Sequence, residues 1–366
     1  MPTRVMLRYQ DSLSATKKFL DNYLLQKNKG VETSFYLSFY LSEDGDNIQV
    51  ARSIRFSRIM RDVELSLKSQ LRSNIASKIL NQLSKLNLAE VVRDNKMSMA
   101  FFASENFAGF VFIPFPVFEN VVVAQSLHLK PILPWIISGD QFYLITLSSK
   151  TCRLLKGDSF SLSEVSSVTL LKSELEKGKK LDDKKLKQKI LARAEADFFQ
   201  FVKNDKFPII VGGVEELHEM YLNINRDTDV LKERIVGNLD KISFEELHDE
   251  CLSILNLIKN RSDQDLLLSY SELKPYGKIV DQLTEITIAA IQGRVRNLMI
   301  ASDRFLWGHL DKSTGLITNH VNKNLAIPED DILDDLAEIV IARGGEVTLF
   351  RYSEMPSDNE AIAFLR

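Results

Sequence analysis

Two groups of basic side chains are the features of this sequence best suited to binding an anion. One is a run of arginines at every third position, and the other is a lysine-rich stretch around a glycine. The groups are Arg52, Arg55, Arg58 and Arg61, and Lys177, Gly178, Lys179, Lys180, Lys184 and Lys185. Arginine forks and lysine ammonium groups both bind phosphate. Both groups therefore indicate contact with RNA.

A solvated helix face without a ligand is the alternative interpretation of both groups. Spacing of three places the arginines on a slowly rotating ridge, and such ridges are common on helices that bind nothing. The lysines lie in a loop and in the first turns of a predicted helix, where they oppose the helix dipole. Asp182 and Asp183 offset that cost only in part. The unfavourable placement fits a binding role better than a structural one.

Side chains for catalysis or metal binding form no recognisable pattern. The sequence contains neither Gly-x-Ser-x-Gly nor His-Glu-x-x-His, and no convincing carboxylate pair. His309, Asp311 and His320 could imitate a ligand set, but their spacing matches no standard metal site. Gly212-Gly213 follows a predicted strand without the lysine of a nucleotide-binding loop. We expect no catalytic residue, no cofactor and no metal.

The charge of the chain is unevenly distributed. The formal net charge is −3, but counting by segment gives about +4 for residues 1–125, −2 for 126–265 and −5 for 266–366. This asymmetry is compatible with one end that meets nucleic acid and another that meets protein. An acidic cluster in the last segment could face a basic partner or stabilise a helix N-terminus. It comprises Glu329, Asp330, Asp331, Asp334 and Asp335.

Length and composition predict a globular protein of two or three domains. The chain has 366 residues, of which 45% are hydrophobic. No apolar run approaches the roughly 20 residues of a membrane span, and no signal-peptide pattern opens the chain, so we expect a cytoplasmic protein. Cys152 and Cys251 are isolated in apolar segments, which is typical of small core residues.

Hydrophobic periodicity predicts an α+β domain over residues 1–125 and two mixed domains after it. The first domain is expected to contain helices at about 13–28 and 58–88, and strands at about 33–41, 100–103, 109–115 and 120–124. The second domain, 126–265, is expected to contain strands at 141–147, 151–155, 160–169 and 208–211, and helices at 182–203, 214–222 and 243–258.

The third domain, 266–366, shows two helix-glycine-strand units. The first comprises a helix at 278–292, Gly293 and a strand at 295–301; the second comprises a helix at 331–343, Gly344-Gly345 and a strand at 346–350. Alternation of helices with strands implies an α/β sandwich.

From about Phe142 onward, the order of elements resembles the middle and C-terminal domains of archaeo-eukaryotic release factors and Pelota, and more closely their bacterial relatives. The segments that carry the resemblance are His128–Pro131, Phe142–Ser148, Val211–His218, Val236–Asp240, Ala290–Val295, Ala301–Asp303 and Gly344–Val347. The resemblance implies three domains: an α+β N-terminal domain placed at the decoding centre, an RNase H-like middle domain and an α/β sandwich C-terminal domain.

The resemblance also implies where a catalytic tripeptide would lie. Release factors carry Gly-Gly-Gln on a loop between the third strand and the long helix of the middle domain. The equivalent interval here, Ser173–Leu181, lacks it. Gly212-Gly213 is followed by Val214, and Gly344-Gly345 by Glu346. We therefore expect no peptide release and no other enzymatic activity.

The function that the resemblance implies is occupation of the ribosomal A site by a monomer shaped like tRNA, delivered by elongation factor Tu, on idle or stressed ribosomes. Such a hibernation factor would contact ribosomal RNA of both subunits. Two alternatives remain open. One is a Pelota-like factor that rescues stalled ribosomes, and the other is a metal-dependent nuclease based on the RNase H-like domain, which would need clustered carboxylates on adjacent strands.

Overall fold

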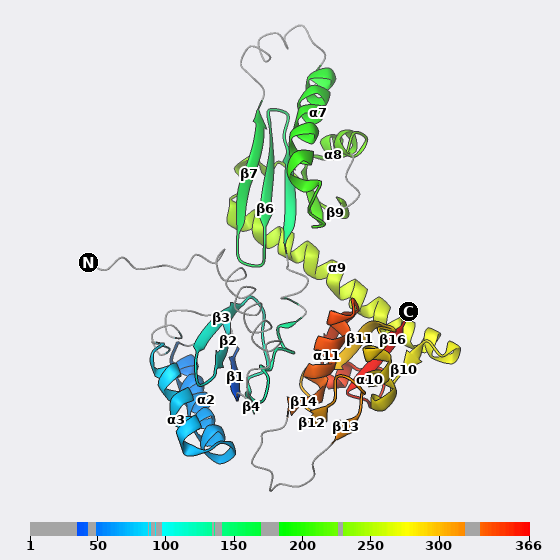
Figure 1. The fold of residues 1–366 in the computed structure, drawn as a ribbon. Coiled ribbons are helices and arrows are strands. Elements are labelled where there is room, and N and C mark those ends of the chain that lie inside the picture. Colours follow the sequence, from blue (N-terminus) through cyan, green and yellow to red (C-terminus); the bar gives the residue numbers. More distant parts are fainter. Residues whose placement is uncertain are drawn as a thin grey trace, which may run out of the picture. The chain divides into compact units, whose positions relative to one another are not determined.

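The computed structural model describes residues 35–42, 49–86, 88, 92, 97–133, 135, 141–169, 183–225, 230–318 and 330–366. The chain divides into two compact units, one formed by 1–138 together with 263–366 and the other by 139–262 (Figure 1). The helix predicted at 13–28 and the loop Lys177–Lys180 lie outside the described residues.

The N-terminal domain is built on an antiparallel sheet in the order β3-β2-β1-β4. The strands are β1 (Tyr36–Leu41), β2 (Ser98–Ala103), β3 (Ala108–Ile113) and β4 (Val121–Ala124). Alternate residues of a strand face opposite sides. Leu37, Phe39 and Leu41 of β1 therefore join the core beneath the helices, while Ser38 and Tyr40 face the other side of the sheet. The predicted α+β domain is confirmed.

Two helices cover one face of this sheet, where the sequence pattern predicted one. They are α2 (Gln49–Gln70) and α3 (Ser73–Ser84). The chain breaks between them because Arg72 is extended, with φ −62° and ψ 143°. The expectation of a single helix over 58–88 is wrong, since the apolar stripe continues across the break and the pattern alone does not reveal it. Phe56, Ile59 and Val63 of α2 lie in the buried core.

The middle domain contains a five-stranded sheet in the order β7-β6-β5-β8-β9. The strands are β5 (Phe142–Leu147), β6 (Thr151–Gly157), β7 (Leu162–Thr169), β8 (Ile209–Gly213) and β9 (Val230–Val236). The first three pair antiparallel and the last two are parallel to β5. This order, third-second-first-fourth-fifth along the chain, is the one expected of an RNase H-like sheet, as predicted.

Helices cover both faces of the middle-domain sheet. Helices α7 (Asp183–Val202) and α8 (Glu215–Leu222) pack on the side of Tyr143 and Ile145. The beginning of α9 (Phe244–Leu273) packs on the side of Phe142 and Leu144. A capping box starts α9, because the Glu246 amide donates to Ser243 Oγ and the Glu246 carboxylate accepts from the Ser243 amide.

Gly212 and Gly213 end strand β8 and are held by close packing. A Cβ atom at Gly212 would lie 2.5 Å from Leu239 Cδ1, and one at Gly213 would lie 2.8 Å from the Leu147 carbonyl oxygen. No larger residue fits without displacing its neighbours. A structural account of this glycine pair is therefore sufficient.

The third domain is a sandwich with a mixed sheet in the order β10-β16-β11-β15. Its elements are β10 (Ile279–Val280), α10 (Leu283–Ile291), β11 (Val295–Ala301), α11 (Ile332–Ala342), β15 (Glu346–Phe350) and β16 (Ala361–Leu365). Helices α10 and α11 contact each other and the sheet. The end of α9 packs against Met299, Ile362 and Phe364 on the sheet. The predicted α/β sandwich is confirmed.

Three short strands accompany this sheet. They are β12 (Trp307–Leu310), β13 (Ile317–Thr318) and β14 (Asp330–Asp331), in the order β13-β12-β14. Strand β14 leads directly into α11, and the Asp331 side chain caps that helix by accepting from the Leu333 amide.

Helix α9 is much longer than the sequence pattern predicted. It was expected to end at Ile258 but continues to Leu273, through the boundary expected at residue 265. The boundary between the two compact units falls inside this helix, between Ser262 and Asp263. The intervening segment, 259–265, is mostly exposed and polar, so it lacks the apolar stripe by which a buried helix is recognised.

Candidate functional site

Helix α7 presents lysines at its start. Lys184 and Lys185 are exposed in its first turn. Lys187 differs, because its side chain is 18% exposed and its Nζ lies 3.0 Å from a carboxylate oxygen of Glu216 on α8. The first two lysines are accessible to an anion as predicted, and their contact with RNA stays a prediction. Lys177, Gly178, Lys179 and Lys180 belong to the part of the chain that the structure does not describe.

The four arginines of α2 do not form one exposed ridge. Arg52 is 2% exposed. Its guanidinium donates to the backbone oxygens of Ser42, Val92 and Met97, at 2.8 Å to Ser42. The expectation that Arg52 faces solvent with the others is wrong, because three carbonyl groups surround it. Arg52 instead ties the start of α2 to the strands beside it.

The other three arginines remain at the surface. Arg55 and Arg58 both approach Glu119, with nitrogen–oxygen distances of 3.2 and 3.7 Å. The Arg58 side chain is 68% exposed, compared with 29% for Arg55, and Arg61 is exposed as well. Exposed ion pairs of this kind are weak and are readily exchanged for other anions. The exposed ridge is therefore shorter than predicted.

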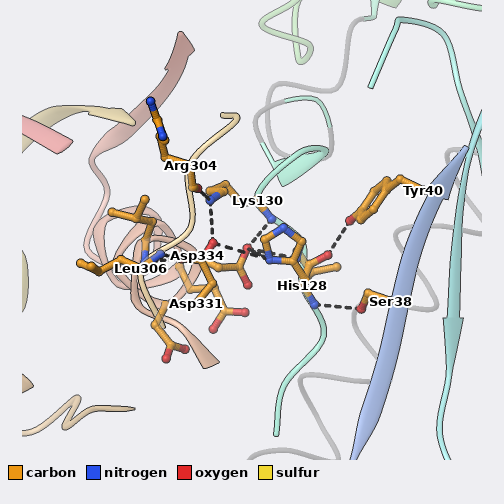
Figure 2. A network of polar contacts seen from close by, with 12 residues as sticks. Ser38, Tyr40, His128, Lys130, Arg304, Leu306, Asp331 and Asp334 are labelled. Atoms are coloured by element: carbon orange, nitrogen blue, oxygen red, sulfur yellow. Dashed lines mark hydrogen bonds and ion pairs between the residues drawn. The ribbon is translucent and has the colours of Figure 1, made fainter. Parts of the chain in front are cut away.

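A buried polar cluster joins the segment after β4 to the start of α11 (Figure 2). The Lys130 side chain is completely buried, and its Nζ donates to Asp331 Oδ2 at 2.6 Å and to the Arg304 carbonyl at 2.7 Å. It also lies 4.7 Å from the centre of the Phe305 ring. No local sequence pattern indicates that this lysine pairs with acidic residues about 200 positions away.

Backbone amides complete the cluster. Asp334 Oδ1 accepts from the amides of Leu129, at 3.0 Å, and Lys130. Asp331 Oδ1 accepts from Leu306 and from Leu333. On the opposite side, the His128 amide donates to Ser38 Oγ, and Tyr40 donates to the His128 carbonyl (Figure 2). The segment is thus held by β1 and by the start of α11 together.

The imidazole of His128 is enclosed by the same groups. Its Nδ1 lies 3.9 Å from Asp331 Oδ2 and 3.8 Å from Asp334 Oδ1, beyond hydrogen-bond distance. Burial, reinforced by the charge of Lys130, holds the pKa of His128 well below its ordinary value. Burial, together with Glu338 and Asp331, raises the pKa of Asp334 well above its ordinary value. The fully buried cluster therefore favours neutral forms of both groups.

This cluster changes the interpretation of the acidic residues at the start of α11. Asp331, Asp334 and Asp335 are only 3 to 4% exposed. Asp335 pairs with Lys312 at 2.7 Å. Of the two alternatives for these residues, the helix N-terminus is confirmed, since Asp331 caps α11 and Asp334 and Asp335 lie in its first turn. The three aspartates are buried and do not present a surface to a basic partner.

Side chains with catalytic potential are buried or scattered among the described residues. Burial raises the pKa of the Cys152 thiol to about 11 and that of Cys251 to about 12. Neither thiol is therefore a ready nucleophile. The described residues contain no group of three or more His, Cys, Asp or Glu side chains that could hold a metal ion. His320 of the metal set considered above lies outside them.

Within the described residues, no helix is both long and apolar enough to cross a membrane.

Comparison with known proteins finds a family model that matches part of the chain. Residues 141–294 match the model of bacterial archaeo-eukaryotic release factor family 3. No curated protein matches the sequence significantly.

Several solved structures are similar in part. Archaeoglobus fulgidus Pelota is 12% identical, with 74% of this chain and 80% of that chain covered and a TM-score of 0.32. Dom34 of S. cerevisiae, a translation termination-like factor, is 13% identical, with 74% and 73% covered and a TM-score of 0.41. A model of ribosome-bound archaeal Pelota is 11% identical, with 74% and 78% covered and a TM-score of 0.42. These scores are too low to establish a common arrangement of whole chains.

The matched residues cover the five-stranded sheet of the middle domain, its helices and the first elements of the third domain. They include the segments Phe142–Ser148, Val211–His218 and Val236–Asp240, so the predicted resemblance to release factors is confirmed over residues 141–294.

Proposed function

We propose that this protein occupies the ribosomal A site in place of tRNA, without catalysis, and that it protects idle ribosomes as a hibernation factor of the Balon type. The observation that carries the proposal is the family match over residues 141–294, which includes the domain that release factors insert into the large subunit. A protein that binds ribosomes in this way would act in the cytoplasm.

The start of α7 supports contact with RNA instead of ester hydrolysis. In this superfamily the loop before the long middle-domain helix reaches the peptidyl transferase centre. Here that loop carries Lys177, Lys179 and Lys180 where release factors carry Gly-Gly-Gln. Lys184 and Lys185 then lie exposed on the first turn of the helix. A lysine-rich tip can bind ribosomal RNA phosphates, but it lacks the glutamine that positions water at the ester.

Competition with tRNA tests the proposal directly. Purified 70S ribosomes would be incubated with this protein and then with aminoacyl-tRNA delivered to the A site. We expect A-site tRNA binding to fall in proportion to bound protein, and peptidyl-tRNA in the P site to remain intact. Undiminished tRNA binding at saturating protein would contradict A-site occupancy, and release of peptide above background would contradict the non-catalytic role.

Dependence on mRNA separates hibernation from rescue. A hibernation factor should bind vacant ribosomes and leave their subunits associated. Binding restricted to ribosomes stalled at a truncated mRNA end, followed by subunit separation with a recycling factor, would instead favour the Pelota-like alternative. Both outcomes can be followed by sedimentation in sucrose gradients.

Delivery by elongation factor Tu is the part of the proposal that rests on family resemblance alone. The buried aspartates of α11 cannot serve as its docking surface while they bind Lys130 and Lys312. Pull-down with elongation factor Tu in its GDP and GTP forms, with and without ribosomes, is the test. If neither form of elongation factor Tu is retained, delivery by this factor is contradicted, while the proposal of A-site binding is unaffected.

A further inference from the structure

The third-domain sheet is basic at one end, where β10 and β11 begin and β16 ends, although the domain as a whole is acidic. This end of the sheet is called the basic edge below. Five cationic residues, Lys278, Arg294, Arg296, Arg343 and Arg366, lie at or beside this edge and are all exposed. They are half of the ten lysines and arginines in residues 266–366. The acidic residues that dominate the domain's net charge are in part buried at the start of α11, so net charge conceals this edge.

Strand pairing brings the cations together. Lys278 precedes β10, Arg294 precedes β11 and Arg366 follows β16, and these three strands are neighbours in the sheet. The Arg366 amide donates to the Arg294 carbonyl at 2.9 Å, and Lys278 Nζ donates to the Arg366 carbonyl at 3.1 Å. Adjacent strands lie about 4.8 Å apart. The row therefore presents cations at short, regular intervals.

The end of α11 extends the row. Arg366 donates through Nη2 to the carbonyls of Arg343 and Gly344, at 3.1 and 2.8 Å. Arg343 is the C-cap residue of this helix. A cation at a helix C-terminus stabilises the helix dipole, and this accounts for Arg366. The same argument applies to Arg343 itself and to Arg294, which lies two residues beyond the C-cap of α10, but it does not account for Lys278 and Arg296.

The side chains at this edge lack acidic partners. Across the described residues, none of the five cations forms a salt bridge with an Asp or Glu side chain. Arg294 donates only to the neutral Gln292, at 2.7 Å. Glu346, at the start of β15, lies 3.5 Å from Asn297 Nδ2. Unpaired arginines held in a row are ready to bind a polyanion.

An aromatic ring stands beside the cations. Tyr276 is 80% exposed, two residues before Lys278, in a turn closed by Gly277 at φ +67°. An exposed tyrosine ring close in sequence to an exposed lysine suits RNA with unpaired bases, since the ring can stack on a base while cations contact phosphates.

We propose that this edge binds RNA, with the arginines on backbone phosphates and Tyr276 stacked on an unpaired base. An acidic protein partner is less well matched, because protein interfaces usually centre on several apolar side chains. The six residues named here contribute one aromatic ring and no exposed aliphatic group. The inference does not require A-site binding, because it concerns RNA recognition by the third domain itself.

The test measures RNA binding by the full chain with fluorescence anisotropy over a salt series. The probes are a labelled RNA hairpin of about 20 nucleotides with an unpaired loop, the fully paired duplex of its stem, and a polyglutamate peptide. Arg294→Ala with Arg343→Ala should weaken binding to the hairpin about tenfold and reduce the log-log salt slope by about 1.4 to 1.8, the value for two phosphates. Arg72→Ala with Arg261→Ala removes the same charge from exposed positions elsewhere and should change neither quantity.

Tyr276 provides the second, independent measurement. Tyr276→Ala should weaken hairpin binding at least about fivefold through loss of stacking, leave duplex binding unchanged, and be rescued by Tyr276→Phe. This variant alters an exposed turn and should keep the fold. It therefore still tests RNA binding if circular dichroism shows that the double-alanine variant is misfolded. Equal hairpin affinity of the wild type and both edge variants would overturn the proposal. Edge-dependent binding of polyglutamate without binding of RNA would overturn it in favour of an acidic protein.

Discussion

Two charged regions of this protein contrast in how they use similar side chains. Around Lys130, a lysine and two aspartates, Asp331 and Asp334, are buried and bind each other or the backbone. Along the sheet edge at Arg294, arginines are exposed and, within the described residues, have no carboxylate partner. Both regions contain residues of the third domain, and its net charge of about −5 counts buried and exposed charges together. Charge counts predict partners only after the buried charges have been set aside.

The largest expected effect comes from breaking the buried pair. Lys130→Met leaves Asp331 buried without its cation, and we expect a loss of about 3 to 5 kcal/mol in the free energy of unfolding. Urea denaturation followed by circular dichroism measures it. Asp331→Asn in the same chain should restore at least half of the loss, because the amide can still cap α11. Lys278→Ala at the basic edge should change stability by less than about 0.5 kcal/mol, and a similar loss for both lysines would erase the contrast.

The arginines of α2 repeat the contrast within one helix. Arg52→Ala removes donors from three carbonyl groups, so a loss of about 1.5 to 3 kcal/mol is expected. Arg61→Ala should stay within about 0.5 kcal/mol. The same denaturation assay applies to both. If Arg52→Ala were neutral while ribosome binding fell, the arginine would belong to the binding surface after all.

Acid should weaken the buried cluster through His128. The pKa of His128 is lowered in the folded state, so below about pH 6.5 the unfolded chain binds a proton that the folded chain does not. The free energy of unfolding therefore decreases as the pH is lowered. The limit is about 1.4 kcal/mol per pH unit. Asp334 acts in the opposite sense, because its pKa is raised and its contribution is lost as pH rises above about 3.8.

A variant isolates the histidine. His128→Phe removes the group that titrates and keeps an aromatic ring beside Tyr40 and Phe305. The stability of this variant relative to the wild type should increase between pH 7 and pH 5. Lys130 repels the imidazolium, while Asp331 and Asp334 attract it, so a difference independent of pH would show that the carboxylates compensate fully.

The smallest effects on stability are expected for the basic groups predicted to contact RNA, which should act on binding instead. Arg55→Ala with Arg58→Ala, or Lys177, Lys179 and Lys180 all changed to alanine, should weaken ribosome affinity and reduce the salt slope by about 0.7 to 0.9 for each lost phosphate contact. Lys184→Ala with Lys185→Ala tests the first turn of α7, which follows that lysine-rich segment. Co-sedimentation over a salt series measures all three, and unchanged affinity and slope would make these groups ordinary solvated surface.

The regular elements of the chain could be predicted well from local pattern. The strands at 142–147 and 346–350 and the helices at 183–202 and 332–342 lie within a few residues of their expected positions. Their apolar residues repeat at the period of the element, and Gly344, at φ +73°, ends α11 as expected. The long continuation of α9 was missed because its exposed middle carries no periodic apolar stripe.

The charged sites could not be sorted by local pattern. Arg52 has the same spacing as Arg55 and Arg58, yet its partners Ser42 and Met97 are 10 and 45 positions away. Asp334 looks like an ordinary acidic residue of a first helical turn until Lys130 meets it. Burial depends on contacts distant in the sequence, and no local period reports them. The basic edge likewise emerges only when β10, β16 and β11 pair.

The sequence separation of Lys130 from Asp331 also has a consequence for folding during synthesis. These residues are 201 positions apart, so at about 5 to 20 residues per second the lysine waits roughly 10 to 40 seconds for its carboxylate during synthesis. Throughout that interval the segment after β4 can bind only to the N-terminal sheet, through Ser38 and Tyr40. Its contacts with the start of α11 form only after the third domain has emerged.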